Sequence, residues 1–453
     1  MSTGVAVKWT IDPTRAAHTL SVRTMKILRH TDPDFAEETA RLNRFAEPSP
    51  AVRQTVSEIV AEVTKNGDAS LLEFTTKFGG PKLGADEIRV SAIELASASV
   101  DEATQKTLEL CHANITAFAS HSLRKNWSMH NEQGVLVGER FDPFQRVGIY
   151  VPGGTAPLVS TALMTVTLAA VAGVPEIVVT TPAGPDGTIH PALLVALRMA
   201  GATEIYRVGG AQAIAALAFG TETIRPVLKI FGPGNSYVIE AKRQVFGKVS
   251  IDQLPGPSEI LVLADDSANP AWIAADLLAQ AEHGHDSVIG FLTDSESLLT
   301  RVQNEIEKQA VTLSRQQYLL EVLEKNAFLI LCNDLAQAVA LANDFSSEHL
   351  SIVARNAEAL AQQIQTAGAI FIGPWSPVAG GDYLAGPSHT LPTGGAGKSF
   401  SGLTVDQFQR RTSVVEFHQH SLRISAPIIA AAAALEGLDA HAHSATIRLP
   451  IQS

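Results

Sequence analysis

The feature that most constrains this chain is a series of short apolar segments that alternate with helical ones from residue 147 onward. The apolar segments have the length of strands, and each gap between them holds one helix. This alternation is typical of βαβ units, in which parallel strands are joined by helices that pack on the sheet. The first series reads "VGIYV", "EIVVTT", "EIYRV" and "VLKIF".

A second series begins after a pause at "QLPGPSE", residues 253–259. Its strand-like segments are "EILVLAD", "SVIGFLT", "AFLILC", "LSIVA" and "AIFIG". The chain of 453 residues is also too long for one ordinary core. We therefore predict an α/β fold with two Rossmann-like parallel-sheet domains, an N-terminal helical part and a C-terminal dimerisation segment.

The predicted domain boundaries follow from these series. Residues 1–30 form an N-terminal arm, and residues 31–146 with 254–373 form a first α/β domain. Residues 147–253 form a second α/β domain, and residues 374–453 form the C-terminal segment. The amphipathic helices before residue 146 have no strands of their own, so we expect them to pack on the sheet of residues 254–373.

The C-terminal segment begins with a stretch rich in Gly, Pro and Ser. It continues in an Ala-rich helix over 425–436 and ends in a strand at "ATIRLP". A segment this separate from the two series is expected to dock on a partner subunit.

Composition excludes several classes of function. The formal net charge is −12, and no run of Lys or Arg is present, so we expect no nucleic-acid or membrane partner. The most apolar run, residues 156–173, is interrupted by Ser and Thr and is predicted to be a buried helix. No signal peptide is visible, which favours the cytoplasm. Cys111 and Cys332 lack partners at metal-binding spacing and are predicted to be core thiols.

Glycine-rich turns follow three strands of the first series. They are "PGG" (152–154), "GGAQ" (209–212) and "GPGN" (232–235). A turn that leads from a parallel strand into a helix offers backbone N–H groups and a helix dipole to a phosphate. None of the turns matches GxGxxG, and each alone is explained as a tight turn. Three at one sheet edge favour a nucleotide-binding crevice.

Polar side chains end the helix that Asn269 and Pro270 begin. In "LLAQAEHGHDS", Gln280 and His283 are neighbours on its last turn. Taken alone, this stretch is better explained as a polar helix end that favours a histidine. Other segments supply further candidate ligands; these are Glu348, His349, Asp382, His389, Glu436, His441 and His443. A Gln, a carboxylate and two imidazoles would suit Zn²⁺ with mixed nitrogen and oxygen ligands.

These motifs together resemble those of the histidinol dehydrogenase family. The resemblance runs over roughly residues 20–450. It is carried by motifs that are each weak alone; they include "VGIYVPGGTAPLVSTALM", "KIFGPGNSYVIEAKRQVFG", "IDQLPGPSEILVLAD", "DLLAQAEHGHDS", "SSEHL", "GDYLAGPSHTLPT" and "EGLDAH". The family oxidises L-histidinol to L-histidine through L-histidinal. The resemblance therefore implies this reaction, and it also implies a homodimer that uses Zn²⁺ and NAD.

The resemblance also assigns roles to residues. Gln280, His283 and Asp382 would bind zinc, completed by His441 of the other subunit, and these four would contact the substrate as well. Further substrate contacts would come from Ser258, His349, His389 and Glu436. The NAD site would contain Tyr150, Gln212 and Asn235. Glu348 and His349 would be the acid/base pair.

Two positions depart from the family pattern. Ser347 stands where Pro is frequent, and Ser388 stands where Asn is usual. Three alternatives stay open: a related zinc and NAD dehydrogenase of another small alcohol such as a sulfonated diol, a zinc hydrolase, and a non-catalytic binding protein. Glu436 and His389, which suit a substrate with an imidazole and an amine, favour histidinol.

Overall fold

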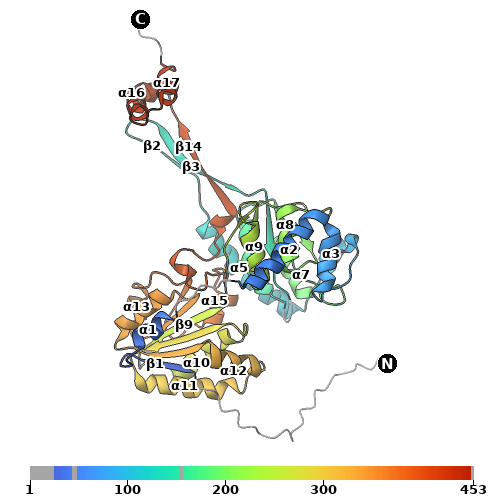
Figure 1. The fold of residues 1–453 in the computed structure, drawn as a ribbon, viewed down its shortest axis with the longest axis vertical. Helices are drawn as coiled ribbons and strands as arrows, with labels where there is room; N and C mark the ends of the chain where they lie inside the picture. The colour runs from blue at the N-terminus through green and yellow to red at the C-terminus, as the bar shows by residue number, and fades with distance from the viewer. Residues whose placement is uncertain (1–24, 43–47, 154–156, 450–453) are drawn as a thin grey trace. The chain divides into compact units, whose positions relative to one another are not determined.

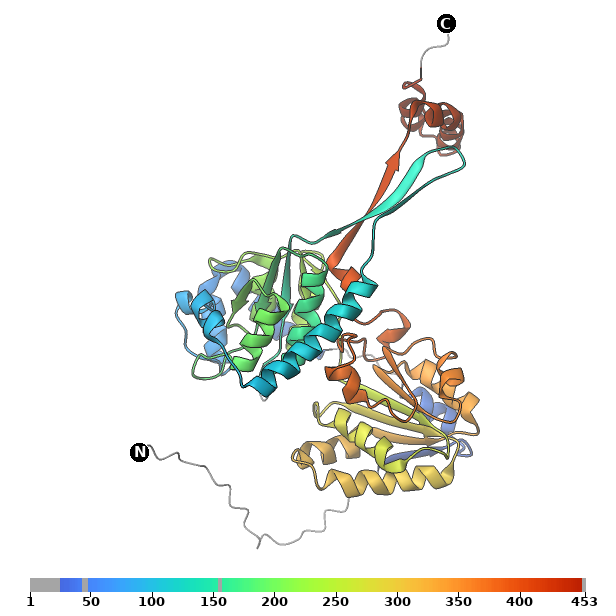
Figure 2. The same ribbon diagram turned by 180° about the vertical axis from the view of Figure 1, so that it is seen from behind.

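The computed structural model describes residues 25–42, 48–153 and 157–449, which form two compact units (Figures 1 and 2). Unit one contains residues up to 43 and residues 257–376. Unit two contains residues 44–256 and 377–453. Most of the predicted N-terminal arm, residues 1–30, lies outside the described residues.

Unit one is built on a six-stranded parallel sheet in the order β1-β11-β10-β9-β12-β13. Its strands are β1 (Lys26–Arg29), β9 (Glu259–Ala264), β10 (Val288–Thr293), β11 (Ala327–Leu331), β12 (His349–Val353) and β13 (Ala369–Ile372). Strands β9 and β12 are fully buried, as expected for central strands covered on both faces.

Helices cover this sheet and confirm the predicted α/β pattern. They are α1 (Phe35–Ala40), α10 (Pro270–Ala281), α11 (Glu296–Ala310), α12 (Gln316–Lys325), α13 (Leu335–Phe345) and α14 (Ala357–Ala361). As predicted, Asn269 caps α10, accepting a hydrogen bond from the N–H of Ala271 at 2.9 Å, and Pro270 is its first residue. The last of these helices, α14, is short and ends at Ala361.

Unit two is built on a five-stranded parallel sheet in the order β6-β5-β4-β7-β8. Its strands are β4 (Arg146–Tyr150), β5 (Glu176–Thr180), β6 (Glu204–Tyr206), β7 (Lys229–Phe231) and β8 (Ser250–Ile251). The linking helices are α6 (Val159–Val171), α7 (Pro191–Ala200), α8 (Gly210–Phe219) and α9 (Ser236–Val245). Helix α6 is buried, as the sequence predicted, and no helix of the described residues is long and apolar enough to span a membrane.

The N-terminal helices differ from the prediction in the sheet that they cover. Helix α2 (Pro50–Asn66) packs against α8 and α9, and α5 (Glu102–Ser122) packs against α6 and α7, all in unit two. Buried residues of α2 share one core with the five-stranded sheet, and buried residues of α5 share the core on its other face. The apolar face of an amphipathic helix predicts that this face is buried. It does not predict which of the two sheets the face packs against. The expected grouping of 31–146 with 254–373 therefore does not match these units.

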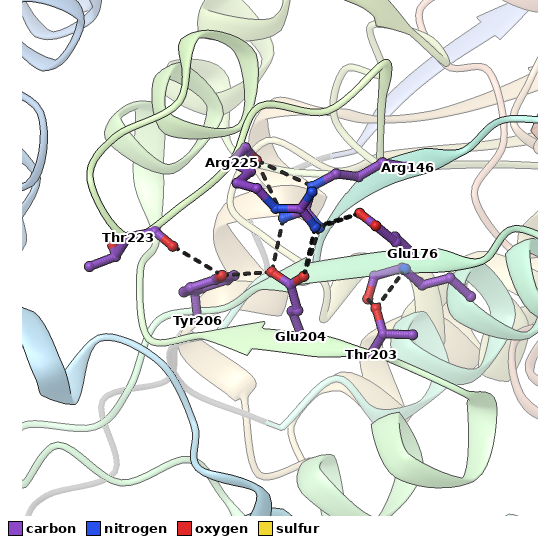
Figure 3. A network of polar contacts seen from close by, with 8 residues as sticks. Arg146, Glu176, Thr203, Glu204, Tyr206, Thr223 and Arg225 are labelled. Atoms are coloured by element: carbon purple, nitrogen blue, oxygen red, sulfur yellow. Dashed lines mark hydrogen bonds and ion pairs between the residues drawn. The ribbon is translucent and has the colours of Figure 1, made fainter.

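A polar network ties the amino ends of β4, β5 and β6 together (Figure 3). Arg146 donates to both carboxylate oxygens of Glu204, at 2.7 and 2.9 Å, and to Glu176 at 2.8 Å. Tyr206 adds a hydrogen bond to Glu204 at 2.7 Å. The Arg146 hydrogen bonds lower the pKa of Glu204 to about 2, so this carboxylate stays charged in the folded protein.

Unit two also contains a three-stranded antiparallel sheet in the order β14-β3-β2, with the helices α16 and α17 at its far end (Figure 1). The elements are β2 (Trp127–His130), β3 (Leu136–Pro143), β14 (Gln409–Glu416), α16 (Gln419–Leu435) and α17 (Asp439–Thr446). The strand expected at "ATIRLP" is wrong, because Ala445 and Thr446 belong to α17 and Ile447–Leu449 are not in a strand. Several apolar side chains here are exposed, among them Leu435 at 91% and Ile447 at 63%.

The cysteines occupy the positions of structural thiols. Cys332 is buried, and burial raises the pKa of its thiol to about 12. Cys111 is half-buried, and desolvation raises its pKa as well. Both cysteines are free thiols, so the prediction of core thiols without a disulfide is confirmed for Cys332 and is only partly met by Cys111.

Candidate active site

The predicted acid/base pair lies at the amino edge of the six-stranded sheet. Glu348 immediately precedes β12, and His349 is its first residue. Both side chains are almost fully buried, at 9% and 3% exposure, and Glu348 Oε2 lies 3.5 Å from His349 Nδ1. A carboxylate and an imidazole held this close in a dry environment are suited to proton transfer.

The backbone of Glu259 holds both groups of the pair. Its N–H donates to Glu348 Oε2 at 2.8 Å, and its carbonyl oxygen lies 3.0 Å from His349 Nδ1. A carbonyl can only accept, so His349 carries its hydrogen on Nδ1, and Nε2 is its basic nitrogen. Strands β9 and β12 are neighbours in the sheet, and their register, His349 opposite Ile260, brings Glu259 to this place.

The chain enters the pair through a constrained turn. Ser346 has a φ of 54° and ends α13 in the left-handed conformation. Its N–H donates to Ala342 O at 2.9 Å and its hydroxyl to Thr366 O at 2.6 Å. Among the described residues it is the only non-glycine with a positive φ. Such a conformation in an L-residue is sustained by surrounding contacts, and here it sets the direction in which β12 begins.

Two predicted zinc ligands meet at the end of α10. Gln280 Nε2 lies 3.2 Å from His283 Nδ1, Gln280 is buried at 1% exposure, and His283 is exposed. The predicted neighbourhood of these side chains is therefore confirmed. The helix itself ends at Ala281, with Glu282 as its C-cap. His285 turns away and makes a hydrogen bond to Glu321 at 2.7 Å.

The remaining predicted substrate and metal residues belong to unit two, apart from Ser258, which directly precedes β9. Asp382 lies in the short helix α15 (Val378–Tyr383), which replaces the expected loop. His389 Nε2 is 3.4 Å from the hydroxyl of Thr161 on α6. Glu436 is the C-cap of α16 and His441 lies on α17, and both are exposed.

The predicted nucleotide residues follow strands of the five-stranded sheet at its carboxyl edge. Tyr150 ends β4, and its hydroxyl accepts from the N–H of Gly210 at 3.1 Å. Burial raises the pKa of this phenol. Gln212 lies in the first turn of α8. Asn235 caps α9 by accepting from the N–H groups of Tyr237 and Val238 at 3.1 and 3.2 Å.

These three residues flank the point where the strand order reverses. The chain runs from β4 outward to β5 and β6, then returns to the other side of β4 for β7 and β8. Nucleotides bind at such a switch point in open parallel sheets. Buried polar atoms without a partner among the described residues also lie in this part of unit two: Gln212 Oε1 and the hydroxyls of Thr180 and Thr181. The residues present therefore fit a polar, phosphate-bearing cofactor.

The donor set also fits a zinc ion. Gln280 and His283 supply adjacent amide and imidazole groups, and Asp382 and His441 would add a carboxylate and a second imidazole. No three His, Cys, Asp or Glu side chains gather as a metal site in the parts of the chain described here. The predicted set takes only two residues of these types, His283 and Asp382, from one copy.

Two contacts of the site were missed by the sequence analysis. The backbone of Glu259 orients both Glu348 and His349, and Thr161 contacts His389. Neither carries a local signal, because backbone groups are the same in every residue and a lone Thr in an apolar helix is common.

Comparisons with known proteins identify the family of this chain. The sequence model described as histidinol dehydrogenase matches residues 42–449. A histidinol dehydrogenase of Synechococcus sp. is 44% identical over 94% of this chain and 98% of its own length. One of Geobacillus kaustophilus is 45% identical over 88% and 94%. The crystal structure of histidinol dehydrogenase from Elizabethkingia anophelis has a TM-score of 0.89 at 34% identity, covering 94% of this chain and 98% of that one. This chain belongs to the histidinol dehydrogenase family.

Proposed function

We propose that this protein oxidises L-histidinol to L-histidine through L-histidinal, as a cytoplasmic homodimer that requires zinc and NAD⁺ and completes histidine biosynthesis. The family match over residues 42–449 supports the substrate class. The observation that carries the chemistry is the buried Glu348–His349 pair, in which the Glu259 carbonyl commits His349 Nδ1 to donation.

Zinc and NAD⁺ would supply the chemistry that the side chains lack. A Zn²⁺ ion would orient the substrate for hydride transfer, and NAD⁺ would accept one hydride in each of the two oxidations. We assign the zinc to Gln280, His283 and Asp382 of one copy and His441 of a second copy. We assign the NAD⁺ contacts to Tyr150, Gln212 and Asn235.

In the first oxidation, His349 Nε2 removes the proton of the substrate hydroxyl as the hydride leaves its carbon. The products are the aldehyde, NADH and one proton. The Glu259 carbonyl favours this step, because it stabilises the N–H at Nδ1 as positive charge develops on the imidazole. Burial of His349 excludes bulk water from the transfer.

In the second oxidation, Glu348 removes a proton from a water molecule that attacks the aldehyde. The hydrate then loses a second hydride, so the products are the carboxylate, NADH and protons. A cysteine route to the acid is disfavoured, because burial raises the pKa of both thiols and keeps them protonated near neutral pH. We therefore assign Glu348 to the second step and His349 to the first.

A steady-state assay tests the proposal. Purified protein is given L-histidinol and NAD⁺, and NADH is followed by absorbance before and after dialysis against a zinc chelator. We expect two NADH per histidinol, loss of turnover after chelation and recovery on adding Zn²⁺. NADH formation from a sulfonated diol but not from histidinol would show that the substrate is wrong. Turnover that withstands chelation would contradict the zinc requirement.

A further inference from the structure

A buried ion pair lies beside the turn of residues 232–235 in unit two. The side chains of Lys242 on α9 and Asp252 after β8 are in contact, and their exposures are 0% and 1%. Two charges removed from water cost several kcal/mol of desolvation, which contacts with polar groups must offset. A buried ion pair therefore adds little to the stability of the fold, and it is better explained by a role in holding nearby backbone groups in place.

The backbone groups that this pair holds are those of Gly232. Lys242 Nζ donates to the carbonyl oxygen of Gly232 at 2.9 Å, and Asp252 Oδ2 accepts from the N–H of the same residue at 2.8 Å. The pair therefore binds both polar backbone groups of one glycine. Asp252 Oδ1 also accepts from the N–H of Gln253 at 2.6 Å, which fixes the chain as it leaves β8.

Gly232 needs such support because its conformation is unusual. Its φ is +110°, and a Cβ at this position would lie 2.1 Å from the carbonyl oxygen of Tyr150. The backbones that follow β4 and β7 thus approach each other closely at the switch point. The next residues, Pro233 and Gly234, lead directly to Asn235 and the first turn of α9.

We propose that Lys242 and Asp252 are positioning residues for the dinucleotide cofactor. They hold the 232–235 turn in the one conformation that presents Asn235 and the start of α9 to the cofactor, and neither touches the substrate. The inference rests on the proposed function, because it assumes that NAD⁺ binds at the carboxyl edge of the five-stranded sheet.

The sheet provides its own matched control. Arg146 and Glu204 form a second largely buried ion pair, at the opposite, amino edge of the same five-stranded sheet (Figure 3). Lys242→Met and Arg146→Met each remove the cation of a pair and leave an apolar side chain of similar length. Both variants disturb stability, so stability alone does not separate them. Only Lys242→Met removes a contact to the 232–235 turn.

The test measures NADH binding by fluorescence, and KM for NAD⁺ and for L-histidinol, well below the unfolding temperature of each variant. We expect Lys242→Met to raise the Kd of NADH and KM for NAD⁺ about tenfold or more, with KM for histidinol changed less than about threefold. Arg146→Met should change the Kd of NADH less than about twofold. If Lys242→Met does not fold, Asp252→Asn is measured by the same criteria, because it weakens the hold on the Gly232 N–H and keeps a side chain of the same size.

Two results would overturn the inference. If Lys242→Met and Arg146→Met weaken NADH binding equally, the Lys242–Asp252 pair has only a structural role. If Lys242→Met leaves NADH binding unchanged, the pair has no role in cofactor binding. Failure of the wild-type protein to bind NADH is a different outcome, because it would refute the proposed function itself. Asp252→Asn gives an independent reading, with the same shift expected in NADH binding and not in histidinol KM.

Discussion

Glu348 and His349 are adjacent in the chain, yet their environments suit them to different tasks. Glu348 accepts a backbone N–H from Glu259, which stabilises its charged, acceptor-only form. His349 donates to the carbonyl of the same residue and so keeps one nitrogen as a base. The backbone of one residue, Glu259, therefore holds the Glu348 carboxylate in place and fixes the tautomer of His349.

Replacing Glu348 should separate the two oxidations. We expect Glu348→Gln to retain about a third or more of the rate from histidinol to histidinal and to lose the rate from histidinal to histidine by about 10²-fold, because an amide cannot take a proton from water. NADH formation from each substrate in separate assays measures both rates. Glu358→Gln, an exposed change in the same unit, is the control. Equal losses in both steps would refute the division of roles.

Removing both thiols should leave catalysis nearly unchanged. Cys332 is buried with a pKa raised to about 12, and desolvation also raises the pKa of Cys111. We expect the Cys111→Ser, Cys332→Ala protein to keep kcat for histidinol within about twofold, with a stability loss of about 1–2 kcal/mol from the space left at Cys332. Urea unfolding measures the second quantity. Abolished turnover in folded protein would revive a thiol intermediate.

Residue-scale prediction succeeded where the signal was local. The i, i+3 spacing of Gln280 and His283 predicted their contact, and Asn269 with Pro270 predicted the start of α10. His441 and His443, at i and i+2, lie on helix α17, which the sequence analysis did not predict. The intervening and flanking alanines favour a helix, and α17 consequently points the two imidazoles in different directions.

At the scale of elements, the Arg146–Glu204 network joins three strands through one guanidinium (Figure 3). The Arg146 hydrogen bonds lower the pKa of Glu204 from 4.5 to about 2. A group whose pKa is lowered by folding stabilises the protein above its unfolded pKa. That contribution is lost as the pH falls through the folded pKa.

The network should therefore set the acid stability of unit two. Between pH 5 and pH 2 we expect the wild type to lose about 2–3 kcal/mol more of its unfolding free energy than Glu204→Gln, which has no carboxylate to protonate. Urea unfolding followed by circular dichroism at several pH values measures this difference. Glu109→Gln, an exposed change on α5, should lose stability in parallel with the wild type. If the unfolding free energy of Glu204→Gln falls with pH in parallel with that of the wild type, the titration of Glu204 is not the cause of the acid sensitivity.

The three-stranded sheet was not predicted from the sequence. Its first two strands are joined by residues 131–135, in which Gly134 has a φ of +75° and donates to Asn131 O at 2.9 Å. That turn was a readable hairpin signal. The third strand, β14, pairs with β3 from about 270 residues further along the chain, and no local pattern encodes such a pairing.

At the scale of the whole molecule, a shared metal site predicts complementation. If the zinc site is shared as proposed, a Gln280→Ala copy and a His441→Ala copy would each lack one ligand, but their hybrid dimer would contain one intact site and one doubly altered site. Random exchange gives half hybrids, so about a quarter of wild-type activity should return on mixing. Activity after mild unfolding and refolding of the mixture measures it. Mixing Gln280→Ala with His283→Ala is the control, since both ligands come from one copy; recovery there, or none in the first mixture, would contradict a shared site.

Exposed apolar side chains on α16 are consistent with the proposed docking on another copy. Ile428 is 57% exposed and Leu435 is 91% exposed, and burying such groups is the main driving force of association.

The fold class was predicted correctly from the alternation of strands and helices. The assignment of the N-terminal helices to a sheet was not, because several surfaces of similar chemistry compete for one amphipathic face.

Strand β1 gives the chain an order of assembly. Residues 26–29 pair with β11, residues 327–331, while the main segment of unit two lies between them in the sequence. During translation β1 must wait for about 300 more residues, which takes roughly 15–60 s at about 5–20 residues per second. The five-stranded sheet can be complete before then. The first strand to leave the ribosome is thus among the last to find its neighbour, and in the interval its unpaired edge is a natural target for a chaperone.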